Sequence, residues 1–196
     1  MADPVKIDWS VSYIDDLLYQ FREKNQSSWY LDQLEILAKD CEHITEFGTF
    51  QGQTAALWLS LEKCKHVRCY DIDYQYCNKE WLNTYARNQG KEIIFYDVDP
   101  IYAEKIEQTD FLFLDTKHTY ERVGYELYKA HKYVNKYIAI HDTEYPAKHK
   151  RTKQFTQFPN KLVRDAVLEF LTNYPEWSVM YDTKINSGLI IIGKKT

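Results

Sequence analysis

Two histidines stand beside acidic residues in ways that suit proton transfer. His118 closely follows Asp115, and His141 directly precedes Asp142. Imidazole titrates near neutral pH, so either ring could take a proton from a hydroxyl group. The alternatives are that His118 caps a helix beginning at Thr119 and that His141 only packs. The sequence therefore offers His118, His141 and Asp115 as candidates for catalysis.

A glycine-containing turn is the second feature that could do chemistry. Residues Glu46–Thr54 read E-x-G-x-x-x-G and lie between the strand-like His43–Thr45 and the helix-like Ala55–Leu61. Glycine permits backbone angles that other residues avoid and lets a ligand lie against the main chain. The helix start adds unpaired N–H groups and a partial positive charge. We therefore expect a ligand at this turn.

The ligand is not expected to be a phosphate. Glu46 at the strand end favours a ligand with a positive or hydroxyl-rich part. The turn also lacks the G-x-G-x-x-G pattern of dinucleotide-binding folds and the Gly-Lys-Ser/Thr of phosphate-binding loops. A nicotinamide-dependent dehydrogenase is therefore disfavoured.

The elements that must position these residues are strand-like segments alternating with helix-like ones, and each of five strands ends in an acid. The strand-end acids are Glu46, Asp71, Asp97, Asp115 and Asp142. Such alternation predicts a parallel sheet with helices on both faces, and ligands bind outside the carboxyl ends of its strands. The alternative is that the acids only solvate the edge of the sheet. The clustering of five acids favours a site.

The pattern predicts one α/β domain over residues 1–196. Two helices, over Val11–Lys24 and from Ser28 onward, occupy residues 1–40 and cover the sheet or the cleft; residues 41–196 form the Rossmann-like core. The expected strands after His43–Thr45 are Val67–Asp71, Glu92–Asp97, Phe111–Asp115, Tyr137–Asp142, Trp177–Asp182 and Gly188–Gly193. The expected later helices are Tyr74–Asn88, Pro100–Gln108, Thr119–Val134 and Asn160–Leu171. The short turn between the last two strands requires them to be antiparallel.

Residues 143–160 show no periodicity and contain the basic run Lys148–Lys153. This segment is either a solvated loop or a lid that closes over a cleft or binds an anionic substrate.

Composition narrows the functional classes. The 196 residues carry a net charge of −4, which gives no general case for binding nucleic acid. The sequence has no apolar run long enough to span a membrane and no signal-peptide pattern at its start. Its four cysteines lack C-x-x-C spacing, and we expect buried, reduced thiols in a cytoplasmic protein.

The turn Glu46–Gly52 and the order of elements after it resemble the class I S-adenosylmethionine (SAM) dependent methyltransferases. Phe113–Glu121 is similar to an I-D-G-x-H-x-Y run, and Ile140–Thr143 to an H-D-T motif, of the cephalosporin-hydroxylase-like and macrocin-type small-molecule O-methyltransferases. The resemblance covers residues 40–194. It implies a Rossmann-like sheet of seven strands, mostly parallel with helices on both faces, in which the last strand is antiparallel.

The resemblance also implies a SAM site. The methionine part would lie along the glycine turn, Glu46 would act through its charge or on the ammonium group, Asp71 would accept from the ribose hydroxyls, and Asp97 with Val98 would meet the adenine. The implied cofactor-binding residues are Glu46, Gly48, Thr49, Phe50, Gly52, Gln53, Asp71, Ile72, Asp97, Val98 and Asp115.

In metal-dependent relatives, acids after strands four and five hold Mg²⁺, which lowers the pKa of a substrate hydroxyl. The implied metal ligands are Asp115, Asp142 and His141. This chain departs from the pattern, because His141 stands where relatives often have an acid or amide, and Lys117 replaces a small or acidic residue. His141 could instead bind a softer metal.

The resulting hypothesis is an O-methyltransferase that acts on a hydroxyl of a small molecule such as a sugar or glycoside. The rival hypothesis is a non-catalytic protein that binds SAM or a nucleoside, or an assembly subunit. A base-modifying methyltransferase is disfavoured, because no Asn/Asp-Pro-Pro-Tyr motif follows the fourth strand. Relatives often form homo-oligomers.

Overall fold

The computed structural model describes residues 6–25, 28–144 and 156–195. The chain divides into two compact units, Met1–Asp99 and Pro100–Thr196, which are taken in turn. The single-domain organisation stays a prediction.

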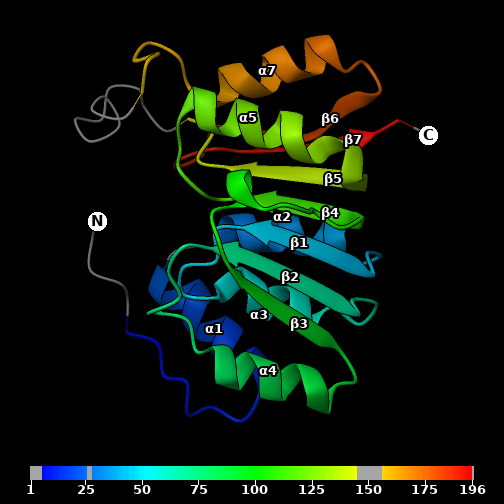
Figure 1. Ribbon diagram of the computed structural model, residues 1–196. Coiled ribbons are helices and arrows are strands. Elements are labelled where there is room, and N and C mark those ends of the chain that lie inside the picture. The colour runs from blue at the N-terminus through cyan, green and yellow to red at the C-terminus, as the bar shows by residue number, and fades with distance from the viewer. Residues whose placement is uncertain (1–5, 26–27, 145–155, 196) are drawn as a thin grey trace. The chain divides into compact units, whose positions relative to one another are not determined.

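The first unit is a three-stranded parallel sheet with four helices (Figure 1). Its elements are α1 (Ile14–Asn25), α2 (Ser28–Ala38), β1 (His43–Phe47), α3 (Gln53–Ser60), β2 (His66–Asp71), α4 (Lys79–Asn88) and β3 (Glu92–Asp97). β2 pairs in parallel with both β1 and β3, and Asp71 lies in register with Asp97. The strand-end acids of β2 and β3 are thus neighbours across the sheet.

Aromatic packing holds the chain before α1 against α4. The Trp9 ring contacts Phe21 with 6.2 Å between centroids and Trp81 with 5.8 Å. Trp81 Nε1 donates to the carbonyl of Val11 at 3.1 Å. The predicted helix over Tyr74–Asn88 is too long, because the Asn78 side chain accepts from the Trp81 N–H and starts the helix there.

The second unit is a mixed sheet of four strands with helices α5 and α7. Its elements are η1 (Pro100–Tyr102), β4 (Thr109–Leu114), α5 (Tyr120–Ala130), η2 (His131–Tyr133), β5 (Val134–His141), α7 (Val163–Asn173), β6 (Trp177–Thr183) and β7 (Leu189–Lys194). β4 and β5 are parallel, whereas β7 runs antiparallel to both β5 and β6. This confirms the predicted antiparallel closing strands.

β4 is buried along its whole length. Every residue from Thr109 to Leu114 is buried, as expected of an apolar strand covered on both faces.

Three helix predictions in this unit are corrected. Pro100–Gln108 forms only the short η1 turn. The helix predicted to reach Val134 ends at Ala130, where the chain passes into η2, and α7 begins at Val163 rather than Asn160.

The strand order is β3-β2-β1-β4-β5-β7-β6 in a seven-stranded sheet. This confirms the predicted mostly parallel Rossmann-like fold. Among the described helices, none has the length and apolar character that a membrane crossing requires.

Candidate functional site

The turn after β1 has the backbone that its glycines predict. Gly48 and Gly52 adopt φ values of 89° and 79°, and Phe50 between them also has a positive φ of 47°. A Cβ placed on Gly52 would lie 2.9 Å from Cys77 Sγ. The positive φ of Gly52 therefore favours glycine, and a side chain at this position would have to displace Cys77 Sγ.

The carboxylate of Asp71 braces this turn. Its Oδ2 accepts from the N–H groups of Thr49 at 2.7 Å and Phe50 at 2.9 Å. Its Oδ1 accepts from the N–H groups of Ile72 at 2.7 Å and Asp73 at 3.2 Å. A carboxylate offers about four lone-pair sites. A ribose diol that binds Asp71, as predicted, would have to replace some of these donors.

Glu46 lies inside the unit rather than on its surface. The side chain is fully buried, and its Oε2 accepts from Trp58 Nε1 at 2.8 Å. Burial raises the pKa of Glu46 to about 7, although the hydrogen bonds it accepts oppose the rise. The carboxylate supports the turn from the core side, and its predicted contact with a ligand stays a prediction.

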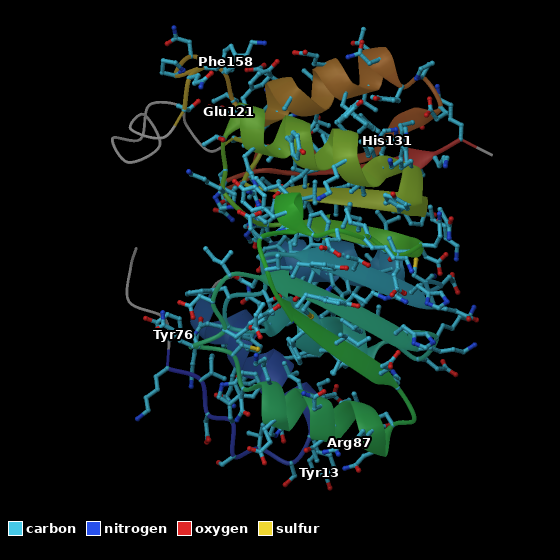
Figure 2. All side chains as sticks on the ribbon, viewed as in Figure 1. Tyr13, Tyr76, Arg87, Glu121, His131 and Phe158 are labelled. Carbon is cyan, nitrogen blue, oxygen red and sulfur yellow. The ribbon has the colours of Figure 1, made fainter. Side chains whose placement is uncertain are left out.

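Apolar side chains are exposed around the braced turn. Phe50 and Tyr76, the latter labelled in Figure 2, meet with 5.6 Å between ring centroids, and Ile72 is 75% exposed. Gln53 donates to the hydroxyl of Tyr30 on α2. Exposed rings beside an acid that can bind a diol would suit a nucleoside. Tyr76 was not among the predicted site residues, because the sequence pattern placed it inside the expected helix Tyr74–Asn88.

The adenine-side residues lie at the end of β3. The Asp97 side chain is 70% exposed and pairs with Lys79 Nζ at 3.3 Å. Val98 is half-buried and donates its N–H to the Tyr96 carbonyl at 2.9 Å. The first unit thus brings Asp71 together with Thr49, Phe50 and Ile72, whereas Asp97 is engaged with a lysine.

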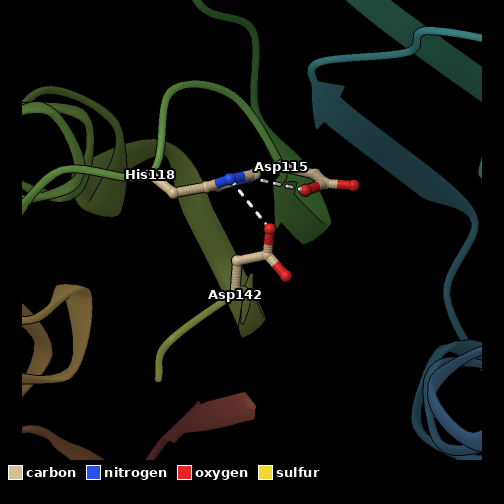
Figure 3. A group of neighbouring side chains, drawn as sticks. All are labelled: Asp115, His118 and Asp142. Atoms are coloured by element: carbon tan, nitrogen blue, oxygen red, sulfur yellow. Dashed lines mark hydrogen bonds and ion pairs between the residues drawn. The ribbon is translucent and has the colours of Figure 1, made fainter. Parts of the chain in front are cut away.

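The second unit brings two acids and two histidines together at the ends of β4 and β5. The Asp–His cluster consists of Asp115, His118, His141 and Asp142. His118 lies between the two acids, with Nε2 3.0 Å from Asp115 Oδ1 and Nδ1 2.8 Å from Asp142 Oδ2 (Figure 3). His141 Nδ1 lies 3.1 Å from the same Asp115 oxygen and 3.4 Å from Asp142 Oδ1. All three predicted catalytic residues, His118, His141 and Asp115, are members of this cluster.

Charge pairing sets the protonation of the cluster. Burial by itself would lower the pKa of His118, but the hydrogen bonds to Asp115 and Asp142 outweigh it and raise the pKa to about 10. The pKa of His141 is also raised, because the attraction of Asp115 overcomes its burial. Conversely, the imidazoles hold the pKa of Asp115 and Asp142 below the usual range against the effect of burial. His118 is therefore protonated in the resting cluster, and its imidazolium lies between the carboxylates of Asp115 and Asp142.

The same atoms form a set of cation ligands. Asp115, His118 and Asp142 each offer one ligand atom, and these atoms lie within 4.8 Å of one another. Two carboxylate oxygens suit Mg²⁺ or Mn²⁺, and the imidazole suits later transition metals. The donor set fits a divalent cation. His118, which was predicted as a catalytic residue, belongs to this triad, and the prediction that His141 is a metal ligand stays a prediction.

The described end of the segment 143–160, for which the sequence left a loop and a lid open, lies on the start of α5. The Glu121 carboxylate accepts from Thr156 Oγ1 at 2.8 Å and from the Gln157 N–H at 2.7 Å. The Phe158 ring packs on Tyr120 with 5.2 Å between centroids, and Figure 2 labels Glu121 and Phe158. Residues 145–155, which include the basic run, fall outside the described residues.

Comparison with solved structures identifies the fold. The O-methyltransferase TomG of Streptomyces achromogenes, solved with SAM, matches with a TM-score of 0.59 and 13% identity over 98% of this chain and 93% of its own. An O-methyltransferase of Bacillus cereus, solved with SAH, matches with a TM-score of 0.57 and 14% identity over 98% and 94%. The SAH-bound methyltransferase PaMTH1 of Podospora anserina matches with a TM-score of 0.59 and 12% identity over 89% and 80%.

In sequence, no family model and no curated protein matches the chain. The likeness is thus one of fold, and it covers 89–98% of this chain and 80–94% of the solved chains. With strand order β3-β2-β1-β4-β5-β7-β6, an antiparallel β7 and a glycine turn after β1, the chain has the class I methyltransferase fold.

Proposed function

We propose that this protein is a SAM-dependent methyltransferase that methylates a hydroxyl group of a small molecule. The observation that carries the proposal is the Asp–His cluster at the ends of β4 and β5 in a class I methyltransferase fold. A cluster of carboxylates and imidazoles can orient a hydroxyl group and receive its proton. The solved structures of similar fold that hold SAM or SAH support the choice of cofactor.

SAM is assigned to the first unit. Its methionine part would lie on the turn Gly48–Gly52, where the two glycines have no side chain to cover the main chain. Asp71 would take the ribose hydroxyls in exchange for backbone donors. The exposed Ile72, with Asp97 and Val98, would contact the adenine.

The acceptor is assigned to the Asp–His cluster of the second unit. During transfer the acceptor oxygen forms a bond to the methyl carbon, and the methyl–sulfur bond breaks with its electron pair left on sulfur. The hydroxyl proton passes to the cluster. Because both ring nitrogens of His118 face carboxylates, His118 must first lose a proton before it can act as the base.

A divalent cation fits the proposal. Asp115, His118 and Asp142 would hold it, and when bound it would lower the pKa of the acceptor hydroxyl. His118 would then serve as a neutral ligand, and His141 would remain hydrogen-bonded beside Asp115.

The rival function is a binding protein without turnover. The four backbone donors on Asp71 and the protonated state of His118 favour it, because both must change before transfer. Conversion of SAM to S-adenosylhomocysteine in the presence of hydroxylated acceptors separates the two functions.

The first experiment is a calorimetric titration of the protein with SAM and S-adenosylhomocysteine, with and without Mg²⁺ or Mn²⁺. Asp71→Ala should abolish cofactor binding, whereas Asp115→Ala, which also removes an implied cofactor contact, should remove the effect of the cation. Asp40→Ala is a matched control. Asp40 forms a surface ion pair with Lys63 and is assigned neither to cofactor binding nor to cation binding, so this variant should bind both like the wild type. No binding of SAM by the wild-type protein would refute the proposal.

A further inference from the structure

Asp142 has a backbone conformation that is rare for its residue type. Its φ is +55°, in the left-handed region, although it is not glycine. Aspartate tolerates this region better than most residues, but the conformation still needs support from its surroundings. The support identifies what aims the Asp142 carboxylate at His118.

The turn between β6 and β7 supplies part of that support. The Glu144 N–H donates to the Ser187 carbonyl at 2.7 Å, and the Thr143 N–H to the Gly188 carbonyl at 3.4 Å. A Cβ on Gly188 would lie 2.5 Å from Thr143 Oγ1 and 2.9 Å from the Glu144 nitrogen. The segment directly after Asp142 is thus packed against this turn with no room for a side chain.

Arg164 in the first turn of α7 supplies the rest. Its backbone N–H donates to the Thr143 carbonyl at 3.0 Å. Its Nη1 and Nη2 donate to the two carboxylate oxygens of Asp182 on β6, at 2.8 Å each, and its Nε donates to Glu144. The residue is only 9% exposed. A planar guanidinium fork bound to two acids fixes both position and direction, which an ammonium group does not do.

We propose that Arg164 is a positioning residue that directs the Asp142 carboxylate toward His118. It acts through Thr143 and Glu144, with Asp182 as its anchor on β6. Its role in catalysis rests on the proposed function of the Asp–His cluster, but its effect on the geometry of the cluster does not.

The effect is measured on the hydrogen bond between His118 and Asp142. In the wild-type protein, the imidazole Nδ1–H of His118 should give a low-field proton NMR signal, assigned by its loss in His118→Gln. In Arg164→Lys this signal should move toward the position of a free imidazolium and exchange with water about tenfold faster. Lysine keeps the positive charge but lacks the planar guanidinium, so a change in the His118 signal would result from the lost orientation of the side chain and not from a lost charge.

Asp182→Asn is the second variant. It keeps the shape of the side chain but removes its negative charge and one acceptor oxygen, so it weakens the hydrogen bonds from the Arg164 guanidinium. It should change the same signal in the same direction. Arg22→Lys is the matched control, since Arg22 also binds two acids, Asp32 and Glu35, on the first unit. It should leave the signal unchanged.

A wild-type signal in folded Arg164→Lys and Asp182→Asn would overturn the proposal. If one variant fails to fold, the other decides. SAM titrations of the same proteins keep the two proposals apart. Wild-type protein that fails to bind SAM refutes the methyltransferase, while the NMR comparison still tests Arg164.

Discussion

Nδ1 of His118 lies 2.8 Å from Oδ2 of Asp142, although the two residues follow different strands. His118 comes back over Asp115 in the turn after β4, and Asp142 leaves β5 with a positive φ. The His118 imidazole thus lies between a half-buried carboxylate, Asp115, and a buried one, Asp142, and either a proton or a divalent cation can balance their charge.

Removal of one acid of the cluster should weaken cation binding. We expect Asp115→Ala and His118→Ala each to lower the affinity for Mn²⁺ by more than about tenfold, because each removes a ligand atom. The binding is measured by electron paramagnetic resonance of free Mn²⁺. His131→Ala is the control, since His131 contacts the Leu127 carbonyl at the end of α5. Equal affinities in all four proteins would exclude this cluster as a cation site.

Loss of the brace on the glycine turn should affect both stability and binding. Asp71→Asn replaces an acceptor oxygen with an NH₂ group that faces backbone donors. We expect a loss of about 1–3 kcal/mol in the free energy of unfolding and at least about tenfold weaker SAM binding. Asp97→Asn, on an exposed acid, should change unfolding by less than about 0.5 kcal/mol. Thermal unfolding and calorimetry provide the numbers, and an Asp71→Asn protein as stable as wild type would contradict the brace.

The buried Glu46 should make stability depend on pH. Its pKa rises from the ordinary value of 4.5 to about 7 in the folded protein, so the folded state holds the proton more tightly. The sign follows directly: stability falls as pH rises from about 4.5 to about 7, by up to about 3 kcal/mol. Glu46→Gln should lack this fall, so its stability relative to wild type should increase between about pH 5 and about pH 8.

Urea unfolding at several pH values checks this expectation. A difference between Glu46→Gln and wild type that does not change with pH would show that Glu46 titrates alike in the folded and unfolded chains.

Two glycines allow the cost of a positive φ to be separated from the cost of space. Gly52 and Gly90 both have positive φ, but a Cβ on Gly52 meets Cys77 Sγ at 2.9 Å, whereas one on Gly90 meets nothing within 4 Å. We expect Gly90→Ala to cost about 1 kcal/mol and Gly52→Ala clearly more. Thermal unfolding of both variants tests the difference. Equal losses would mean that Cys77 moves aside freely.

Much of this fold could be predicted because its signals are local. The apolar run of β4 predicted a buried strand, and the parallel direction of the strands predicted that the acids after them lie at one edge of the sheet. The start of α4 was missed because Asn78, rather than the periodicity, decides where that helix begins, whereas its end at Asn88 was predicted correctly. The early end of η1 likewise had no signal in the apolar pattern.

Candidate site residues could be named from the sequence, but the contacts between them could not. Asp71 at the end of β2 accepts hydrogen bonds from the glycine turn after β1. This contact depends on how the two loops meet, which the spacing of residues in the sequence does not reveal. The position of His118 between Asp115 and Asp142 has the same cause, and Arg164 gave no signal because its partners Glu144 and Asp182 are distant in sequence.

The occupied carboxylate of Asp71 has a kinetic consequence. Any diol that binds it must wait until Thr49 or Phe50 releases its hydrogen bond, so association includes an opening step. That step belongs to the protein and not to the ligand. SAM, S-adenosylhomocysteine and adenosine should therefore share one limiting association rate at high concentration, and differ mainly in how fast they leave.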